Sequence, residues 1–224
     1  MTALAGTADL TGLALRRDRI MIPGWLYALT ASVVGSAFSF RTLYATQAER
    51  TGLARSMNAS GPLRALYGPV YDAHTIGALT GWRMGVLGSA LAGLMSLLIV
   101  VRHTREEEET GRQEMLGATM VDRRAPLTAA LAAAAAADTA LTVIIAGGMM
   151  LVGQGVAGSV ALGLVVGCGG LMFAGVAAVT AQLTQSARLA RGLAGTVLGG
   201  AFLLRAAGDA ATTDSSSPLV WASP

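Results

Sequence analysis

Residues 102–124, RHTREEEETGRQEMLGATMVDRR, form a strongly charged segment between two long apolar runs. The 23 positions hold five of the sixteen arginines and six of the thirteen acids. The 18 residues before them, 84–101, carry no charge, and the 49 residues 139–187 that follow farther on carry none either. This pattern predicts a polar loop that joins membrane-spanning helices.

The whole chain is too apolar for an ordinary soluble domain. It has a mean hydropathy of +0.57 and only 13% charged residues, against about 25% in typical globular domains. Because about 20 consecutive apolar residues span a bilayer, the long uncharged runs predict an all-α integral membrane protein. We expect one polytopic domain over residues 1–224, a bundle of about five to six transmembrane helices.

The uncharged runs and turn residues place the spans and the loops between them. The predicted spans are residues 20–40, 83–101, 126–152, 156–181 and 189–205. Between and around them we expect an interfacial helix over 1–19, an extracellular loop over 41–82, a coupling loop over 102–125 and an extracellular tail over 206–224. The last span has only 13 uncharged residues, so the arginines at its two ends must reach outward to the interfaces.

The arginine distribution predicts the orientation, since cytoplasmic loops carry an excess of positive charge. Ten arginines fall on the side of the N-terminus and the charged segment, and six fall on the other side. We therefore expect a multi-pass protein of the cell membrane with a cytoplasmic N-terminus.

Small residues four positions apart let membrane helices approach closely. The candidate pairs are Gly81/Gly85, Ser89/Gly93, Gly163/Gly167 and Gly195/Gly199. They indicate a packed bundle and no particular function. In the outer loop, Tyr67 and Tyr71 are either interfacial anchors or the lining of a substrate exit.

The charged segment contains oppositely charged residues four positions apart, which favours a helix that continues the second span. The pairs are Arg102/Glu106, Arg105/Glu109 and Glu108/Arg112. Such pairs contribute only about 0.2–0.5 kcal/mol each, so four consecutive acids are poorly explained by stability alone. The segment is either a solvated helical extension or a docking surface for a soluble partner, which is the interpretation we prefer.

Asp138 is the single charged residue within the predicted third span. An acid inside the membrane is costly and often functional, so Asp138 suggests either proton coupling or a buried polar contact between helices. Both interpretations remain open from the sequence.

Several chemistries are excluded by residue content. The chain has no lysine, whereas a nucleotide-binding P-loop needs one. It has one cysteine, Cys168, and two histidines, His74 and His103, too few for a metal cluster of usual spacing. Without hydrolase or metalloprotease motifs, we expect no catalytic, cofactor-binding or metal site on this chain.

A family resemblance accounts for the charged segment. The run VRHTREEEETGRQEML over 101–116, followed by RRAPL over 123–127, resembles the cytoplasmic loop of actinobacterial ABC-type-2 exporter permeases, the exporters of polyketide antibiotics. Further similar segments are LTGL (10–13), ALYGPVYD (65–72), AQLTQSAR (181–188), FLLRAAGD (202–209) and SPLVW (217–221). The resemblance covers nearly the whole chain.

The resemblance implies contacts with a separate ATP-hydrolysing subunit through two regions. The first is the N-terminal interfacial helix, with Leu13, Arg16, Arg17 and Arg19 as candidates. The second is the coupling loop, whose candidates are Arg105, Glu106, Glu107, Glu108, Glu109, Gly111, Arg112, Glu114, Met115 and Leu116. Family members usually carry two six-span halves, and this sequence covers about five spans of the first.

The expected partners follow from the same resemblance. They are an ABC ATP-binding subunit in two copies or as a dimer, a second permease half or copy, the lipid bilayer and a hydrophobic small molecule; no nucleic acid is expected. ATP and Mg²⁺ would belong to the partner subunit, and the cargo would be antibiotics, other drugs or lipids moved outward. The alternatives are an ion- or proton-coupled carrier that uses Asp138 and a non-transporting membrane scaffold.

Overall fold

The computed structural model describes residues 6–109 and 124–211, and its regular structure in these ranges is entirely helical. Five helices are long and apolar enough to cross a membrane. They are α2 (Met21–Leu43), α5 (Ile76–Val101), α8 (Ala125–Leu151), α9 (Val156–Leu183) and α10 (Ala187–Ala211). The prediction of an all-α polytopic bundle is confirmed.

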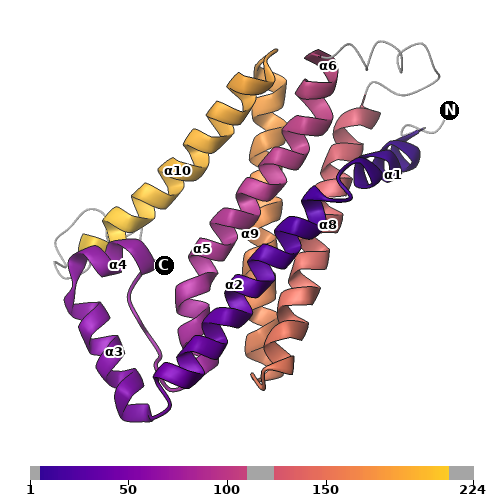
Figure 1. Cartoon of the computed structure of the whole chain (residues 1–224). Helices are drawn as coiled ribbons and strands as arrows, with labels where there is room; N and C mark the ends of the chain where they lie inside the picture. Colours follow the sequence, from indigo (N-terminus) through magenta and orange to yellow (C-terminus); the bar gives the residue numbers. More distant parts are fainter. Residues whose placement is uncertain (1–5, 110–123, 212–224) are drawn as a thin grey trace.

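Short helices lie at both ends of the bundle (Figure 1). Helix α1 (Thr7–Arg17) precedes α2, while α3 (Gln47–Ala59) and α4 (Gly61–Tyr67) lie between α2 and α5. Beyond Val101, α5 continues as a π-helical segment, Arg102–Glu106, and as the single turn α6 (Glu107–Glu109). The end of the bundle that carries α1 and α6 is called the charged end below, and the end with α3 and α4 the loop end.

Helix α9 packs against both α5 and α8, and these three helices form the centre of the molecule. Small residues make this possible. A methyl group at Gly163 would lie 2.5 Å from the carbonyl oxygen of Thr142, and one at Gly93 would lie 2.6 Å from the ring of Phe173. Ser89/Gly93 and Gly163/Gly167 thus lie at helix contacts, whereas Gly195 and Gly199 have no neighbouring atom within 4 Å of such a methyl group.

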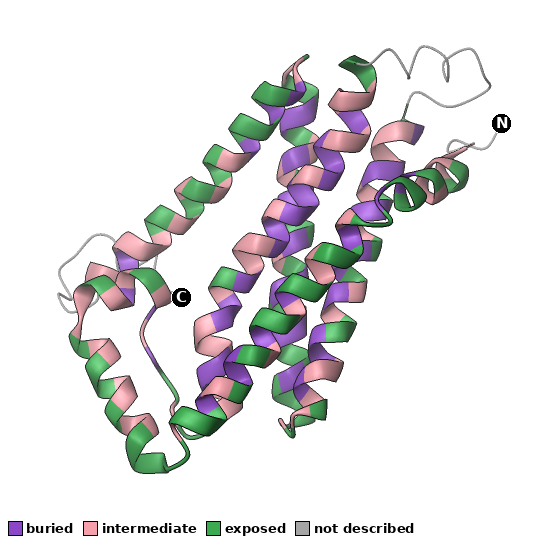
Figure 2. Ribbon diagram, viewed as in Figure 1, coloured by how far each residue is buried: buried purple, intermediate pink, exposed green. Residues whose placement is uncertain are grey.

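Helix α10 is the most exposed of the long helices, as the predominance of green and pink along it in Figure 2 shows. Its large apolar side chains, including Leu189, Leu193 and Leu203, are exposed. It contacts α9, α4 and α5, and in Figure 1 it diverges from α5 toward its C-terminal end beside α4.

Two predicted boundaries differ from the structure. The predicted outer loop ran to residue 82, but α5 begins at Ile76, where the side-chain oxygen of Thr75 accepts a hydrogen bond from Ala78 N at 3.0 Å. The predicted tail began at residue 206, but α10 continues to Ala211. It can do so because the two charged side chains near its end, Arg205 and Asp209, form an ion pair four residues apart.

Candidate functional site

The charged end is built around the π-helical segment Arg102–Glu106. A π-helical turn widens the helix and rotates the residues after it relative to an α-helix, and such turns are frequent at functional sites. Here the segment lies beside α8 and the start of α10. Several of its polar side chains therefore reach other elements, while Arg105 also pairs with Glu108 of the same extension.

Asp18, between α1 and α2, is the most buried acid at this end, with 1% of its surface exposed. Its carboxylate forms an ion pair with Arg102 at 3.0 Å and a hydrogen bond with His103 Nε2 at 2.7 Å. Arg102 also reaches the sulfur of Met21 at 3.5 Å. The junction of α1 and α2 is thereby fixed to the extension of α5.

Helix α1 makes a second connection to the same extension, because Arg17 forms an ion pair with Glu107. It also packs along α8, where the hydroxyls of Thr7 and Thr128 are 3.4 Å apart. Its opposite face is open. Leu13 is 58% exposed, and Arg16 and Arg19 are exposed without an ion pair to any residue in the described ranges.

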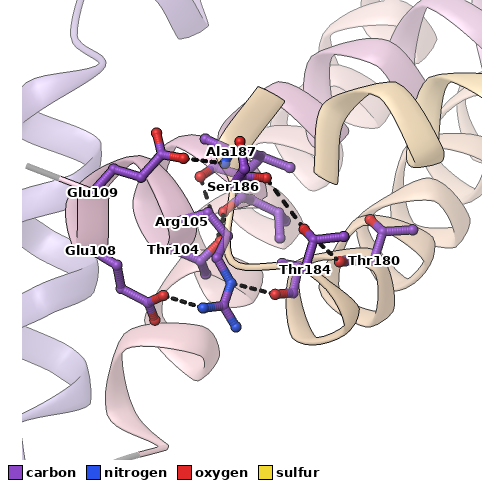
Figure 3. A network of polar contacts seen from close by, with 11 residues as sticks. Thr104, Arg105, Glu108, Glu109, Thr180, Thr184, Ser186 and Ala187 are labelled. Atoms are coloured by element: carbon purple, nitrogen blue, oxygen red, sulfur yellow. Dashed lines mark hydrogen bonds and ion pairs between the residues drawn. The ribbon is translucent and has the colours of Figure 1, made fainter. Parts of the chain in front are cut away.

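Figure 3 shows how the extension reaches α9 and α10. The Arg105 guanidinium donates to the carbonyl oxygen of Ala181 near the end of α9 and pairs with Glu108. The carboxylate of Glu109 accepts a hydrogen bond from the backbone N–H of Ala187 at 2.6 Å. This bond satisfies a donor in the first turn of α10, which the helix itself leaves unpaired.

Two of the three ion pairs predicted within the segment do not form, and the third, Glu108/Arg112, includes a residue outside the described ranges. We expected Arg102 to pair with Glu106 and Arg105 with Glu109, but Arg102 pairs with Asp18 and Arg105 with Glu108. Glu106 lies 3.7 Å from Arg191 of α10. The π-helical turn explains the difference, because the four-residue spacing of charges assumes an α-helix.

The predicted contact residues that the structure describes therefore gather at one end of the bundle. They are Leu13, Arg16, Arg17, Arg19, Arg105, Glu106, Glu107, Glu108 and Glu109. Several of them contact other helices of the chain, which the sequence interpretation did not foresee. Gly111, Arg112, Glu114, Met115 and Leu116 lie outside the described residues.

Asp138 lies in the centre of the bundle, fully buried on α8. Its two carboxylate oxygens are 2.9 and 2.8 Å from the hydroxyl of Ser96 on α5, which donates to them. On the other side, Gly170 of α9 packs so closely that a methyl group there would overlap the carboxyl group. Of the two interpretations, these surroundings favour a polar contact between helices.

The loop end contains a second buried ionic group, which the sequence interpretation missed. Arg205 and Asp209 pair at 2.8 Å, and the Asp209 side chain is completely buried. Arg64 of α4 donates to the carbonyl oxygens of Asn58 and Ala210, at 3.3 and 3.1 Å. These contacts hold α4 against the end of α10.

The sequence interpretation missed two groups, Asp18 and the Arg205–Asp209 pair, although a sequence pattern marks each of them. Asp18 is an isolated acid between Arg17 and Arg19, which is unusual in a basic flank whose only role is orientation. Arg205 and Asp209 have the four-residue spacing of a helical ion pair. That spacing indicated a longer helix rather than a tail beginning at residue 206.

No family model matches the chain. The multidrug efflux system permease protein of Mycobacterium tuberculosis is 41% identical to it over 224 residues. The match covers 100% of this chain and 40% of that protein, so the chain spans less than half the length of this relative. Together with the five long apolar helices, this similarity identifies a multi-pass membrane protein related to a multidrug efflux system permease.

Proposed function

We propose that this chain is a permease part of an ATP-driven exporter that moves hydrophobic compounds out of the cell. ATP and Mg²⁺ would be held by a separate ATP-binding subunit, in two copies or as a dimer. A second permease half or copy would complete the path across the bilayer. The similarity to a multidrug efflux permease supports this proposal, as does the absence of any lysine for a P-loop.

The observation that carries the proposal is the set of polar contacts at the charged end. The family resemblance assigns α1 and the charged loop to the ATPase interface, and in this structure these regions are joined to α2, α9 and α10. A displacement of α6 by a partner would therefore be transmitted to three membrane helices. A coupling segment requires such connections, because a change at the partner's binding surface must reach membrane helices that can adopt a second arrangement.

The partner would approach the open face of α1. Arg16 on α1 and Arg19, just beyond its end, are exposed and form no ion pair with described residues. Surface charges of this kind govern partner choice and the rate of association more than affinity. The excess of arginine on this side further supports a cytoplasmic charged end.

The test is co-purification of the tagged protein from membranes of its host, with mass spectrometry of the bound proteins and measurement of ATP hydrolysis and dye efflux. We expect an ATP-hydrolysing subunit in the preparation. We further expect its loss in the double variant Arg16→Glu/Arg19→Glu. Arg55→Glu is the matched control, because Arg55 is exposed on α3 at the opposite end.

Efflux that continues after ATP is depleted would contradict the proposal, as would a wild-type preparation without any ATP-hydrolysing protein. Equal loss of the ATPase in Arg55→Glu would contradict docking at α1 specifically. These outcomes separate an ATP-driven exporter from an ion-coupled carrier and from a scaffold.

A further inference from the structure

A cavity of about 580 Å³ lies at the loop end, where the beginnings of α5 and α9 meet the end of α8. The residues that line it are mostly small and apolar: Thr75, Gly77, Ala78, Gly81, Gly85, Met149, Gln154, Gly155, Gly158, Ser159, Ala161, Leu162 and Val165. Two of them, Gly158 and Val165, are exposed. The cavity is therefore open to its surroundings.

The distance between α5 and α9 increases toward the loop end. A methyl group at Gly88 would lie 3.0 Å from Val166, and one at Gly85 would lie 4.0 Å from Val165. One at Gly81 would meet no atom within 4 Å. The two helices are thus in contact up to Gly85 and apart beyond it, and the cavity is a wedge that is closed at Gly85 and wide toward the loop end.

The depth of this wedge matches one leaflet of a bilayer. Helices α5 and α9 begin at Ile76 and Val156, and both starts lie at the loop end of the membrane spans. The lining positions of α5 run from residue 75 to residue 85, about 15 Å at about 1.5 Å per residue. This is half of the roughly 30 Å of hydrocarbon in a bilayer.

The chemistry of the wall favours an apolar occupant. None of the described residues that line the wedge has an ionisable side chain. Its two hydroxyl groups are used within the chain, since Thr75 accepts from Ala78 N at 3.0 Å and Ser159 donates to the Gly155 carbonyl oxygen at 2.8 Å. A charged or strongly polar group would lose its hydration there without compensation, whereas an alkyl chain has none to lose.

Gln154 provides a polar group at the wide end of the wedge. Its Oε1 lies close to α5, because a methyl group at Gly77 would be 3.2 Å from it. Gln154 is partly exposed, and its side chain forms no hydrogen bond with any residue in the described ranges. An amide can both donate and accept hydrogen bonds, which suits the uncharged ester groups where the acyl chains of a lipid begin.

We propose that the wedge between α5 and α9 holds one acyl chain of a membrane lipid from the leaflet at the loop end. The ester group lies beside Gln154, and the methyl end of the chain lies near Gly85. The proposal depends on the membrane-spanning position of these helices and not on the proposed transport function.

The test uses the complete protein in nanodiscs that contain one of two photoreactive phosphatidylcholines. One lipid carries a diazirine near the carbonyl end of an acyl chain, and the other carries it near the methyl end. After irradiation, mass spectrometry identifies the residues to which each lipid is attached. Within residues 75–85 and 154–165, we expect the first lipid to attach near Gln154 and the second near Gly85.

Gly81→Leu is the variant that fills the wedge. Since a methyl group at Gly81 meets no atom within 4 Å, the added side chain enters the cavity without displacing a helix. We expect attachment to residues 75–85 and 154–165 to be lost, while attachment to the exposed Leu189 and Leu193 of α10 continues. Gly192→Leu is the matched control, because Gly192 also has no atom within 4 Å of such a methyl group and lies outside the wedge. It should leave attachment in the wedge unchanged.

The depth order in the unsubstituted protein can overturn the proposal by itself. Absence of attachment in the wedge would mean that water or another protein fills it, and attachment by both lipids without the expected order would indicate ordinary surrounding lipid. Equal attachment in Gly81→Leu and Gly192→Leu would also overturn the proposal. Ordered attachment in a protein without ATP-dependent efflux would support the lipid site and reject the proposed function.

Discussion

The carboxyl group of Asp138 lies where α5, α8 and α9 meet, and its contacts with the other two helices connect all three. Ser96 donates to it from α5, and Gly170 of α9 leaves the space that it occupies. Removing the glycine should therefore be more damaging than its small size suggests.

Gly170→Ala is expected to destabilise the protein by about 1–3 kcal/mol, because the added methyl group overlaps the Asp138 carboxyl group in a closely packed interior. Thermal unfolding in detergent measures the effect. The matched control is Gly175→Ala on the same helix, where a methyl group meets nothing within 4 Å. The cost should shrink in an Asp138→Ala background, since the two sites are in contact. An equal cost in both backgrounds would contradict this explanation.

Asp18 serves the charged end in a comparable way, because one buried carboxylate forms an ion pair with Arg102 and accepts a hydrogen bond from His103. Asp18→Ala should cost about 1–3 kcal/mol, the usual range for a buried donor left without its acceptor. The exposed Asp9→Ala on α1 should have little effect on the same unfolding transition. If both variants unfold alike, the buried contact contributes nothing.

At the scale of residues, sequence analysis found Asp138 but missed Asp18 and the Arg205–Asp209 pair. An acid is conspicuous in an apolar run and is not conspicuous among arginines. The partners of Asp18 lie 84 and 85 positions farther along the chain, and no local pattern indicates contacts of that range.

At the scale of elements, two residues three positions apart in the sequence, Thr46 and Glu49, cap the start of α3. The hydroxyl of Thr46 accepts from Glu49 N at 3.3 Å, and Thr46 N donates to the Glu49 carboxylate at 2.9 Å. The Thr46 N–H that donates to the Glu49 carboxylate, and next the Thr46 side chain, hold the pKa of Glu49 below its ordinary value of 4.5.

Since the lowered pKa belongs to the folded state, the ionised Glu49 stabilises the start of α3 above about pH 4.5, and the contribution is lost as the pH falls through the folded-state pKa. Hydrogen exchange of amides 47–50, corrected for intrinsic rates, should show this loss of protection on acidification. Glu49→Gln should remove the pH dependence, because the amide keeps an acceptor at every pH. A pH response that persists in this variant would exclude Glu49 as its cause.

The other helix ends show what sequence patterns recover and where they fail. The span over 156–181 was expected within two residues of α9 (Val156–Leu183), because Gly153 and Gly155 mark the turn before it. Helix α5 begins before the predicted span 83–101 and α10 ends after the predicted span 189–205, because Trp82, Arg83 and Arg205 were taken as markers of the membrane boundary and a helix can extend beyond that boundary. The π-helical turn after Val101 changed the two predicted ion pairs, Arg102/Glu106 and Arg105/Glu109, whose residues the structure describes.

At the scale of the whole molecule, buried polar groups lie at the two ends and at the centre, and apolar helices connect them. The charged end joins α1, α2, α9 and α10 through the extension of α5, and the loop end joins α4 to α10. Helix α10 thus makes polar contacts at both of its ends. It is also the least buried of the long helices. This arrangement suits a helix that moves when its charged end is displaced.

A charge exchange between α1 and α6 tests whether that displacement passes through contacts within the chain. Arg17 and Glu107 are 33% and 17% exposed, so their ion pair should change stability by less than about 1 kcal/mol. If the chain is part of the proposed ATP-driven exporter and this pair transmits movement, Arg17→Glu and Glu107→Arg should each lower ATP-dependent dye efflux, and the double exchange should restore it. Arg16→Glu combined with Glu107→Arg should not restore it, because Arg16 forms no ion pair with the described residues. Efflux that stays low in the double exchange, with the ATPase still bound, would instead place Arg17 or Glu107 in direct contact with the partner.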